Sequence, residues 1–290
     1  MIIDIKDLSG ADKQHYLQHL IAPRPVCFAS TINQKGEINL SPFSFFNLFS
    51  IDPPVVIFSP SRRVRDNTVK HTLENVKDVP EVVINIVDYD MVQQASLASC
   101  EYPRGVNEFE KAGFTMEHSI MVQPPMVKES KAKLECKVME VISLGEKGGS
   151  GNLVLSEIML LHIDESVLDR YNRVDQTKIH HIARLGGNWY CKVDSNNLFE
   201  VEKPNVKLGI GFDGLPDHIK NSRVLTGNQL GILANVESLP VAAGNFSDPQ
   251  LKKIAEHGEI NRVHQYAAAL IDKGQIAAAW QVLLQSADLF

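Results

Sequence analysis

Two long apolar runs joined by a glycine-rich segment limit the possible folds more than any other feature of the chain. Residues 134–144 and 153–163 are each long enough for a strand, and the glycine-rich residues 145–151 between them predict a hairpin. Shorter apolar runs, of the length typical of buried strands, occur at residues 26–32, 55–59 and 82–87. Strands therefore dominate. This predicts a mainly β fold, a closed or nearly closed antiparallel barrel rather than a doubly wound sheet.

Helices are expected at the two ends of the chain and in short peripheral pieces. Ser9 is a suitable N-cap for a helix over residues 11–20, and Pro23 then ends that segment. Thr72 is expected to be the N-cap of another helix, over residues 72–76. Further short helices are expected at residues 91–99 and 107–112.

The composition changes beyond Val193. Residues 194–197 and 202–205 are rich in helix and strand breakers, which indicates a boundary. From residue 248 onward apolar residues recur at helical spacing, and residues 272–275 divide them into a helical hairpin. We therefore expect three parts, a barrel at 1–195, an irregular connecting segment at 196–245 and a C-terminal helical extension at 246–290. The extension could cover its own barrel, clasp a second subunit or bind another partner.

Charge and cysteine content exclude several classes of function. The net charge of -6 argues against nucleic-acid or membrane-surface partners, which need a basic face. No apolar run is long enough to span a membrane, and the start of the chain does not resemble a signal peptide. The four cysteines are far apart in sequence, which favours reduced thiols in a cytoplasm. His180 and His181 have no ligands at metal-binding spacing, so no metal site is expected.

The segment from Ser41 to Asn47 combines aromatic rings with polar groups. Phe43, Phe45 and Phe46 alternate with two hydroxyls and an amide between two apolar runs. This mixture suits a wall that packs a flat ring and offers it hydrogen bonds, although an ordinary aromatic core is the alternative.

A basic segment follows this aromatic one. It contains Arg62, Arg63, Arg65 and Lys70 and leads directly into the helix expected at Thr72. Helix N-termini and cations together can bind a phosphate, whereas a solvated surface loop is the alternative. A ring wall followed by a phosphate site predicts binding of flavin mononucleotide (FMN).

These residues carry a resemblance to a known family. The chain is similar to the flavin reductase-like, FMN-binding split-barrel family, which includes flavoredoxin, and the similarity covers roughly the first 190 residues. The family usually has Asp where this chain has His71. The matching segments are residues 23–26, 30–31, 39–47, 52–54, 70–75, 83–86, 134–136 and 183–188.

The resemblance implies a split β-barrel that binds FMN, forms a homodimer and takes electrons from NADH or NADPH. The acceptor would be free flavin, a flavin-dependent oxygenase or another protein. Hydride transfer to a flavin needs little acid–base help, so no catalytic residue is assigned. The residues that it implies for FMN are Thr31, Ser44, Phe45, Asn47, Ser59, Arg62, Lys70, Thr72, Gly187 and Asn188.

Several alternatives remain open from the sequence. The protein could be a flavoredoxin-type electron carrier or flavin-binding protein without NAD(P)H activity, or a binding module whose barrel is only a scaffold. Residues 183–190 could approach the flavin or the dimer interface, or form a strand-edge bulge. Residues 209–214 match the dinucleotide fingerprint G-x-G-x-x-G, but no β-α-β unit surrounds them, so a turn is expected there.

Overall fold

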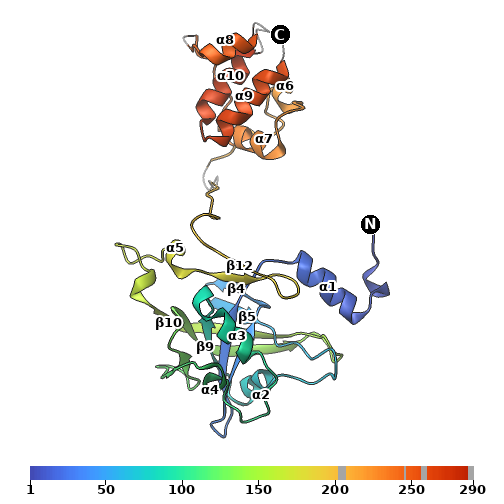
Figure 1. Cartoon of the computed structure of the whole chain (residues 1–290), viewed down its shortest axis with the longest axis vertical. Coiled ribbons are helices and arrows are strands. Elements are labelled where there is room, and N and C mark those ends of the chain that lie inside the picture. Colours follow the sequence, from blue (N-terminus) through green and yellow to red (C-terminus); the bar gives the residue numbers. More distant parts are fainter. Residues whose placement is uncertain (202–206, 245, 256–259, 287–290) are drawn as a thin grey trace. The chain divides into compact units, whose positions relative to one another are not determined.

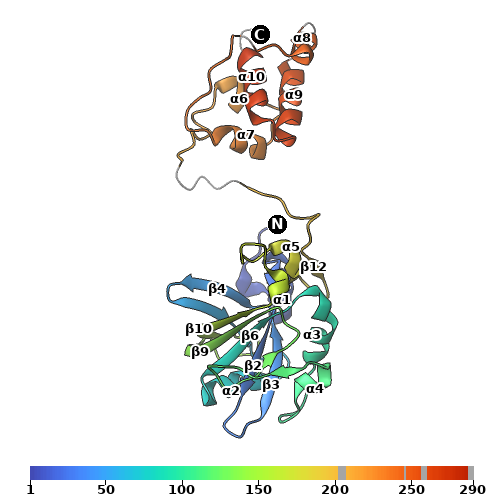
Figure 2. The same ribbon diagram turned by 90° about the vertical axis from the view of Figure 1, so that its left-hand side faces the viewer.

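The computed structural model describes residues 1–201, 207–244, 246–255 and 260–286 of the chain (Figures 1 and 2). They form two compact units, Met1–Phe199 and Glu200–Phe290. The first unit is built on strands and the second on helices, which fits the predicted change of composition beyond Val193. Residues 202–205, part of the predicted boundary, lie outside the described residues. None of the described helices combines the length and apolar character needed to cross a bilayer.

A seven-stranded antiparallel sheet forms the first unit, in the order β3-β2-β6-β9-β10-β5-β4. The predicted long hairpin is confirmed, because β9 and β10 pair from Asn152 opposite Ser143 to Ile163 opposite Ala132. β3 and β4 stand at the two ends of this order, so the sheet is an open or split barrel. Its strands are β2 Cys27–Ile32, β3 Ile38–Phe43, β4 Phe46–Ile51, β5 Pro54–Phe58, β6 Glu81–Ile86, β9 Ala132–Ser143 and β10 Asn152–Ile163.

Strand β2 is buried on both faces, which fits its apolar start at Cys27, Phe28 and Ala29. Cys27 and Ala29 pack into one core together with Phe58 and Val154. On the opposite face Phe28 packs into a second core, which α3 Val92–Ala98 and α4 Glu108–Ala112 cover (Figure 2). Two short sheets complete the unit: β1 Arg24–Pro25, β11 Ile182–Arg184 and β12 Tyr190–Lys192 form one, and β7 Met116–Glu117 and β8 Met126–Val127 form the other.

The N-terminal helix agrees with the prediction, whereas the cap of the next helix does not. α1 spans Gly10–Leu20, and the Ser9 hydroxyl accepts a hydrogen bond from the Asp12 amide. α2 spans His71–Asp78, so its N-cap is Lys70 and the prediction of Thr72 as cap is wrong. Thr72 is a buried residue inside the first turn, where its hydroxyl donates a hydrogen bond to Asn39 Oδ1 on β3. The remaining short helices are η1 Ile5–Asp7, η2 Tyr89–Met91, η3 Glu165–Val167 and α5 Gln176–Ile179.

The second unit has its own apolar core. The predicted C-terminal helices are present, and the alanine faces contribute Ala267 and Ala279 to that core. The expectation of an irregular segment at 196–245 is wrong for α6 and α7, whose Ile219 and Leu233 pack into the same core. Residues 211–214 form a turn, as expected, with Gly211 at positive φ. The helices are α6 Asp217–Lys220, α7 Gly227–Ala234, α8 Pro249–Ala255, α9 Ile260–Asp272 and α10 Ile276–Ser286.

Candidate functional site

A cavity of about 120 Å³ lies where β3, the start of α2 and the segment after α3 meet. Its walls combine two basic side chains with hydroxyls, a thiol and two carboxylates. Such a mixture of donors around a small hollow suits a polar, anionic group better than an apolar one. The lining residues are Asn39, Ser41, Arg63, Lys70, His71, Thr72, Ser99, Cys100, Glu101, Tyr102 and Glu108.

Lys70 is the central cation of this cavity. Its Nζ donates a hydrogen bond to Ser41 Oγ at 2.9 Å and lies 4.8 Å from the centre of the Phe43 ring. Among the described residues no carboxylate forms an ion pair with it. Burial, together with the charge of Arg63, lowers the pKa of Lys70 to about 8. An anion in the cavity would supply the counter-charge that this ammonium lacks.

The arginines of the basic segment differ in how their charge is balanced. Arg63 Nε pairs with Glu101 at 3.1 Å, and Arg65 pairs with both Glu101 and Asp66. Arg62 instead donates only to the Asn67 carbonyl oxygen, and its Nε is buried without a partner in the part of the chain described. Arg62 and Lys70 are therefore the cations of this segment that form no ion pair among the described residues, although Glu108 and Glu101 favour the charged form of Lys70 from a distance.

A buried hydrogen-bond chain fixes the floor of the cavity. The Thr72 hydroxyl donates to Asn39 Oδ1 at 2.6 Å, and Asn39 Nδ2 donates to Glu108 Oε1 at 2.8 Å. Glu108 Oε2 also accepts from the Leu40 amide at 3.0 Å. Burial raises the pKa of Glu108, although these hydrogen bonds oppose the rise. The chain ties α2 and α4 to β3 and thereby positions Ser41 below Lys70.

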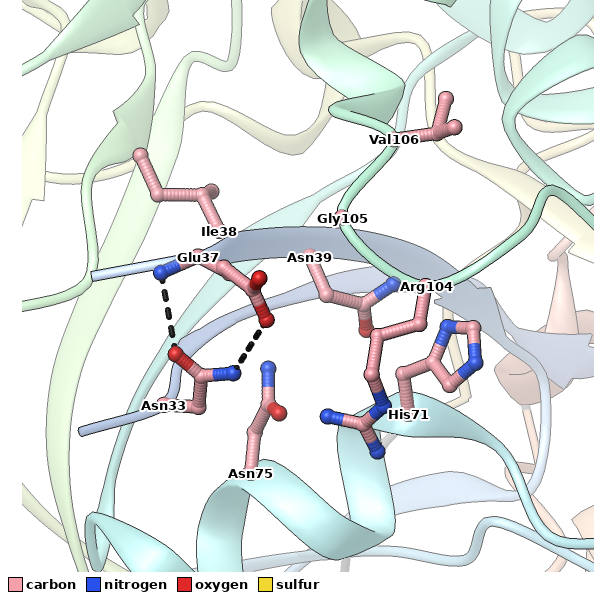
Figure 3. Close-up of a pocket in the computed structure, with 9 residues that line it drawn as sticks. All are labelled: Asn33, Glu37, Ile38, Asn39, His71, Asn75, Arg104, Gly105 and Val106. Carbon is pink, nitrogen blue, oxygen red and sulfur yellow. Dashed lines mark hydrogen bonds between the residues drawn. The ribbon is translucent and has the colours of Figure 1, made fainter. Parts of the chain in front are cut away.

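A smaller hollow of about 10 Å³ adjoins this cavity, and Figure 3 shows the residues that line it. It shares Asn39 and His71 with the larger one. Figure 3 also shows the hydrogen bonds that Asn33 exchanges with Glu37 across the β2–β3 turn. The space suits about one water molecule. His71 thus borders both hollows, and burial together with Arg104 and Arg63 lowers its pKa.

The predicted ring wall divides into an inner and an outer part. Phe43 is buried and its ring centre lies 5.2 Å from that of Phe58, so this ring belongs to the core. Phe45 is 43% exposed, Asn47 near the start of β4 is also exposed, and Ser44 is half-buried. We call these three residues the outer strip, because all three are at least partly open to solvent and a flat ring could lie against them.

The other predicted residues lie in different places. The Ser59 amide donates to the Phe45 carbonyl oxygen at 2.8 Å, so Ser59 adjoins the outer strip. Thr31 is fully buried, accepts a hydrogen bond from Asn75 at 3.2 Å and lines neither hollow. Gly187 and Asn188 are exposed at the turn between β11 and β12. Lys70 and Thr72 are thus the predicted residues that share the cavity.

Some residues of the site were not predicted as contacts. Asn39 and Ser41 belong to a segment that supported the resemblance, so their position next to Phe43 was the available signal. Glu108 had no signal, because it lies 69 residues from Asn39 in sequence and meets it only through the docking of α4 on β3. Within the described residues no group of three or more metal-ligating side chains gathers anywhere.

Known proteins with similar sequences share this part of the chain. The model of the "Flavin reductase like domain" family matches residues 20–178. A protein of Aquifex aeolicus is 37% identical over 188 residues, which are 65% of this chain and 93% of that protein. Protein BH2278 of Halalkalibacterium halodurans is 30% identical over 208 residues, which are 71% of this chain and 98% of that protein. Both relatives are described as uncharacterized.

Solved structures agree with this match. Nitrilotriacetate monooxygenase component B from Bacillus cereus superposes with a TM-score of 0.64 at 27% identity, over 69% of this chain and 98% of that one. A putative flavin reductase with a split barrel domain from Shewanella frigidimarina gives 0.59 at 25% identity, over 70% and 99%. Flavoredoxin of Desulfovibrio vulgaris shares the fold with a TM-score of 0.53 at 19% identity, over 63% and 92%.

Proposed function

The chain belongs to the flavin reductase-like family, and from this premise we propose that it binds FMN and passes electrons from NADH or NADPH through it to free flavin or a partner protein. The observation that carries the proposal is the ammonium of Lys70 in a small polar cavity, where it donates to a neutral hydroxyl and forms no ion pair with any described carboxylate. A phosphate group fits both the charge and the size of that cavity.

FMN is larger than the cavity, so only its phosphate end would enter. Ligand pockets for molecules of this size usually measure about 300–1,000 Å³. In our proposal Lys70 holds the phosphate from the wall of the cavity. Arg62 and Ser59 do not line the cavity and would be further donors on the outer side of the phosphate. The ring would then lie along the outer strip of Ser44, Phe45 and Asn47. FMN, when bound there, supplies the redox chemistry, while the protein holds the ring and leaves one face open.

We further propose a homodimer that covers the outer strip. Edge strand β4 exposes Phe49 by 64% and Ile51 by 77%, next to the 49% exposed Leu48. An exposed apolar edge strand is a liability unless another surface covers it. A second copy of the chain would complete the flavin site from outside. Replacing Ile51 by Lys should then yield monomers in light scattering and weaken FMN binding, whereas an unchanged dimer would contradict this arrangement.

The electron acceptor is proposed to be a flavin-dependent oxygenase or another acceptor protein. The name of the Bacillus cereus neighbour, component B of a monooxygenase, supports an oxygenase partner. Four free cysteines support a reducing compartment such as the cytoplasm.

Anaerobic stopped-flow reduction by NADH and by NADPH tests the electron donor. The purified protein should be yellow or should bind added FMN. One of the two dinucleotides should reduce the flavin, which is seen as loss of its yellow colour after mixing. Tight FMN that neither dinucleotide reduces, but that a partner reductase does reduce, would favour the flavoredoxin-type carrier. Protein that stays colourless and binds no added FMN would contradict both functions.

A further inference from the structure

Two arginines face each other across the short sheet without an acidic partner. Arg24 of β1 pairs in register with Arg184 of β11. Neither guanidinium forms an ion pair in the part of the chain that the structure describes. Burial, together with the charge of Arg184, lowers the pKa of Arg24. In a chain with a net charge of -6, two adjacent cations without a carboxylate need an explanation.

Arg24 connects the N-terminal helix to the short sheet through hydrogen bonds. It donates to the carbonyl oxygens of Gln18 and Ile21 at the C-terminal end of α1, at 2.8 and 2.6 Å. It also donates to the Leu185 carbonyl oxygen at 3.1 Å. These bonds attach α1 to the β11–β12 hairpin, and the helix end favours a cation. The two Nη groups of Arg24 are therefore held by carbonyl oxygens, while its Nε is buried without a partner among the described residues.

Arg184 has N–H donors that are not used within the described residues. Two of its N–H groups donate to the Tyr190 hydroxyl and to the Gly187 carbonyl oxygen, and the guanidinium lies 4.6 Å from the centre of the Tyr190 ring. The remaining N–H groups of its planar fork have no acceptor among the described residues. At the adjoining turn the amides of Gly187 and Asn188 likewise donate to no described acceptor, and Gly187 has φ +59°.

The position of the pair links it to the proposed flavin ring. The Arg24 guanidinium lies 5.8 Å from the centre of the Phe45 ring, which belongs to the outer strip. Neither arginine lines the Lys70 cavity, which we assign to the phosphate of FMN. An anion beside Arg184 would therefore belong to a second molecule, one that lies against the flavin.

We propose that Arg184, positioned by Arg24 and aided by the Gly187 and Asn188 amides, binds an oxyanion of the compound that exchanges hydride with the flavin. Planar guanidinium groups hold phosphates and carboxylates through two parallel hydrogen bonds. The oxyanion comes either from the diphosphate of NADH or NADPH or from the carboxylate of an aromatic acceptor. This inference rests on the proposed function, because it places the second molecule beside bound FMN.

Binding of simple anions tests the site without catalysis. Full-length protein saturated with FMN is titrated with inorganic diphosphate or benzoate in a calorimeter, so that flavin already occupies the Lys70 cavity. We expect one of the two to bind, and Arg184→Gln to weaken that binding at least tenfold. Arg184→Lys, which keeps the charge without the planar fork, should weaken it less. Lys192→Gln is the matched control, because it removes one charge from the same hairpin but lies over Tyr89.

Reduction kinetics identify the source of the oxyanion. If the oxyanion belongs to the electron donor, Arg184→Gln should raise the NAD(P)H concentration for half-maximal reduction about tenfold and leave the FMN affinity within twofold. Diphosphate should then compete with the dinucleotide. If the oxyanion belongs to the electron acceptor, benzoate should instead compete with the acceptor when the reduced flavin is reoxidised. Equal behaviour of Arg184→Gln and Lys192→Gln in both experiments would overturn the proposal.

Failure of the proposed function looks different. In that case the protein would bind no FMN, and the anion titration would be repeated on flavin-free Lys70→Gln protein, in which the phosphate cavity lacks its cation. If the double variant Lys70→Gln/Arg184→Gln binds the anion more weakly than Lys70→Gln alone, the oxyanion site is still supported. If the two proteins bind the anion equally, the site is refuted.

Discussion

Lys70 Nζ donates to Ser41 Oγ at 2.9 Å, and this neutral hydroxyl is the hydrogen-bond acceptor that the ammonium finds. The two residues lie 29 positions apart, on β3 and at the N-cap of α2. A cation whose hydrogen bond goes to a neutral hydroxyl rather than to a carboxylate can still form an ion pair with a ligand. The proposed phosphate site depends on this relationship.

The first prediction concerns phosphate capture. Lys70→Ala should weaken FMN binding about 10- to 100-fold, because a hydrogen bond to a charged group contributes about 1.5–3 kcal/mol. Riboflavin lacks the phosphate, so its affinity should change less than twofold, and Arg62→Ala should show the same selectivity. Arg65→Ala is the control, since Asp66 and Glu101 already pair with that side chain. Fluorescence titration measures all of these, and equal losses for both flavins would place Lys70 elsewhere.

The second prediction concerns pH. Because the pKa of Lys70 is about 8, its ammonium loses its proton as the pH rises above that value. FMN affinity should therefore fall between about pH 7 and 9, a range in which the flavin phosphate stays doubly charged. Lys70→Arg keeps its charge throughout and should flatten the profile. His71 should add affinity only below its usual pKa of about 6.5, because its pKa is lowered. A wild-type profile that matches Lys70→Arg would contradict this role.

A third prediction concerns the stability cost of this site. The pKa of Lys70 is lower in the folded protein than the ordinary value of 10.5. Between about pH 8 and 10.5 the unfolded chain thus binds more protons, and stability should rise with pH across that window. Lys70→Met should raise the free energy of unfolding at pH 7 by roughly 1 kcal/mol while FMN binding is lost. Urea denaturation measures the change, and a destabilised Lys70→Met would show that the Ser41 contact matters more.

The fourth prediction concerns Glu135, which is fully buried on β9. Burial alone would raise its pKa, but hydrogen bonds from the Ile120 and Met121 amides and from His162 outweigh burial and hold the pKa below its usual range. This contribution to stability is present above about pH 4.5 and is lost as the pH falls through the lowered pKa.

Glu135→Gln should therefore lower the free energy of unfolding at pH 7 by about 3 kcal/mol, because the substituted amide cannot accept all of these bonds. Thermal unfolding monitored by circular dichroism between pH 3 and 7 gives both the loss and its pH dependence. Glu140→Gln is the control, since Glu140 is exposed on the same strand. Similar unfolding temperatures for the two variants would rule out the buried-carboxylate role.

The fifth prediction concerns the helical unit. A chain ending at residue 245 retains α6 and α7 but loses α9 and α10, so that Ile219 and Leu233 lose part of their core. That truncation should aggregate in size-exclusion chromatography. A chain ending at Phe199 keeps the whole first unit and should stay soluble and bind FMN. If this shorter form binds no flavin, the helical unit must be part of the site. Whether residues 1–195 fold as a domain by themselves stays a prediction until then.

Local sequence patterns predicted the structure correctly where residues close in sequence determine it. The β9–β10 hairpin follows from two apolar runs and the glycine-rich turn between them, because a hairpin pairs residues that are close in sequence. The Ser9 cap of α1 is local for the same reason. Thr72 was misassigned as a cap because its acceptor, Asn39, lies on another element and no local pattern reveals it.

The sequence by itself determined the family, the mainly β architecture, the helical C-terminal part and the segments that contain the proposed FMN contacts. Only the tertiary structure decided which cations of the basic segment form ion pairs. Glu101 reaches Arg63 and Arg65 but not Lys70, and Arg184 comes to lie beside Arg24 from the far end of the unit. These pairings depend on strand register and helix docking between residues far apart in sequence, and the charge balance of a site follows from distances in space.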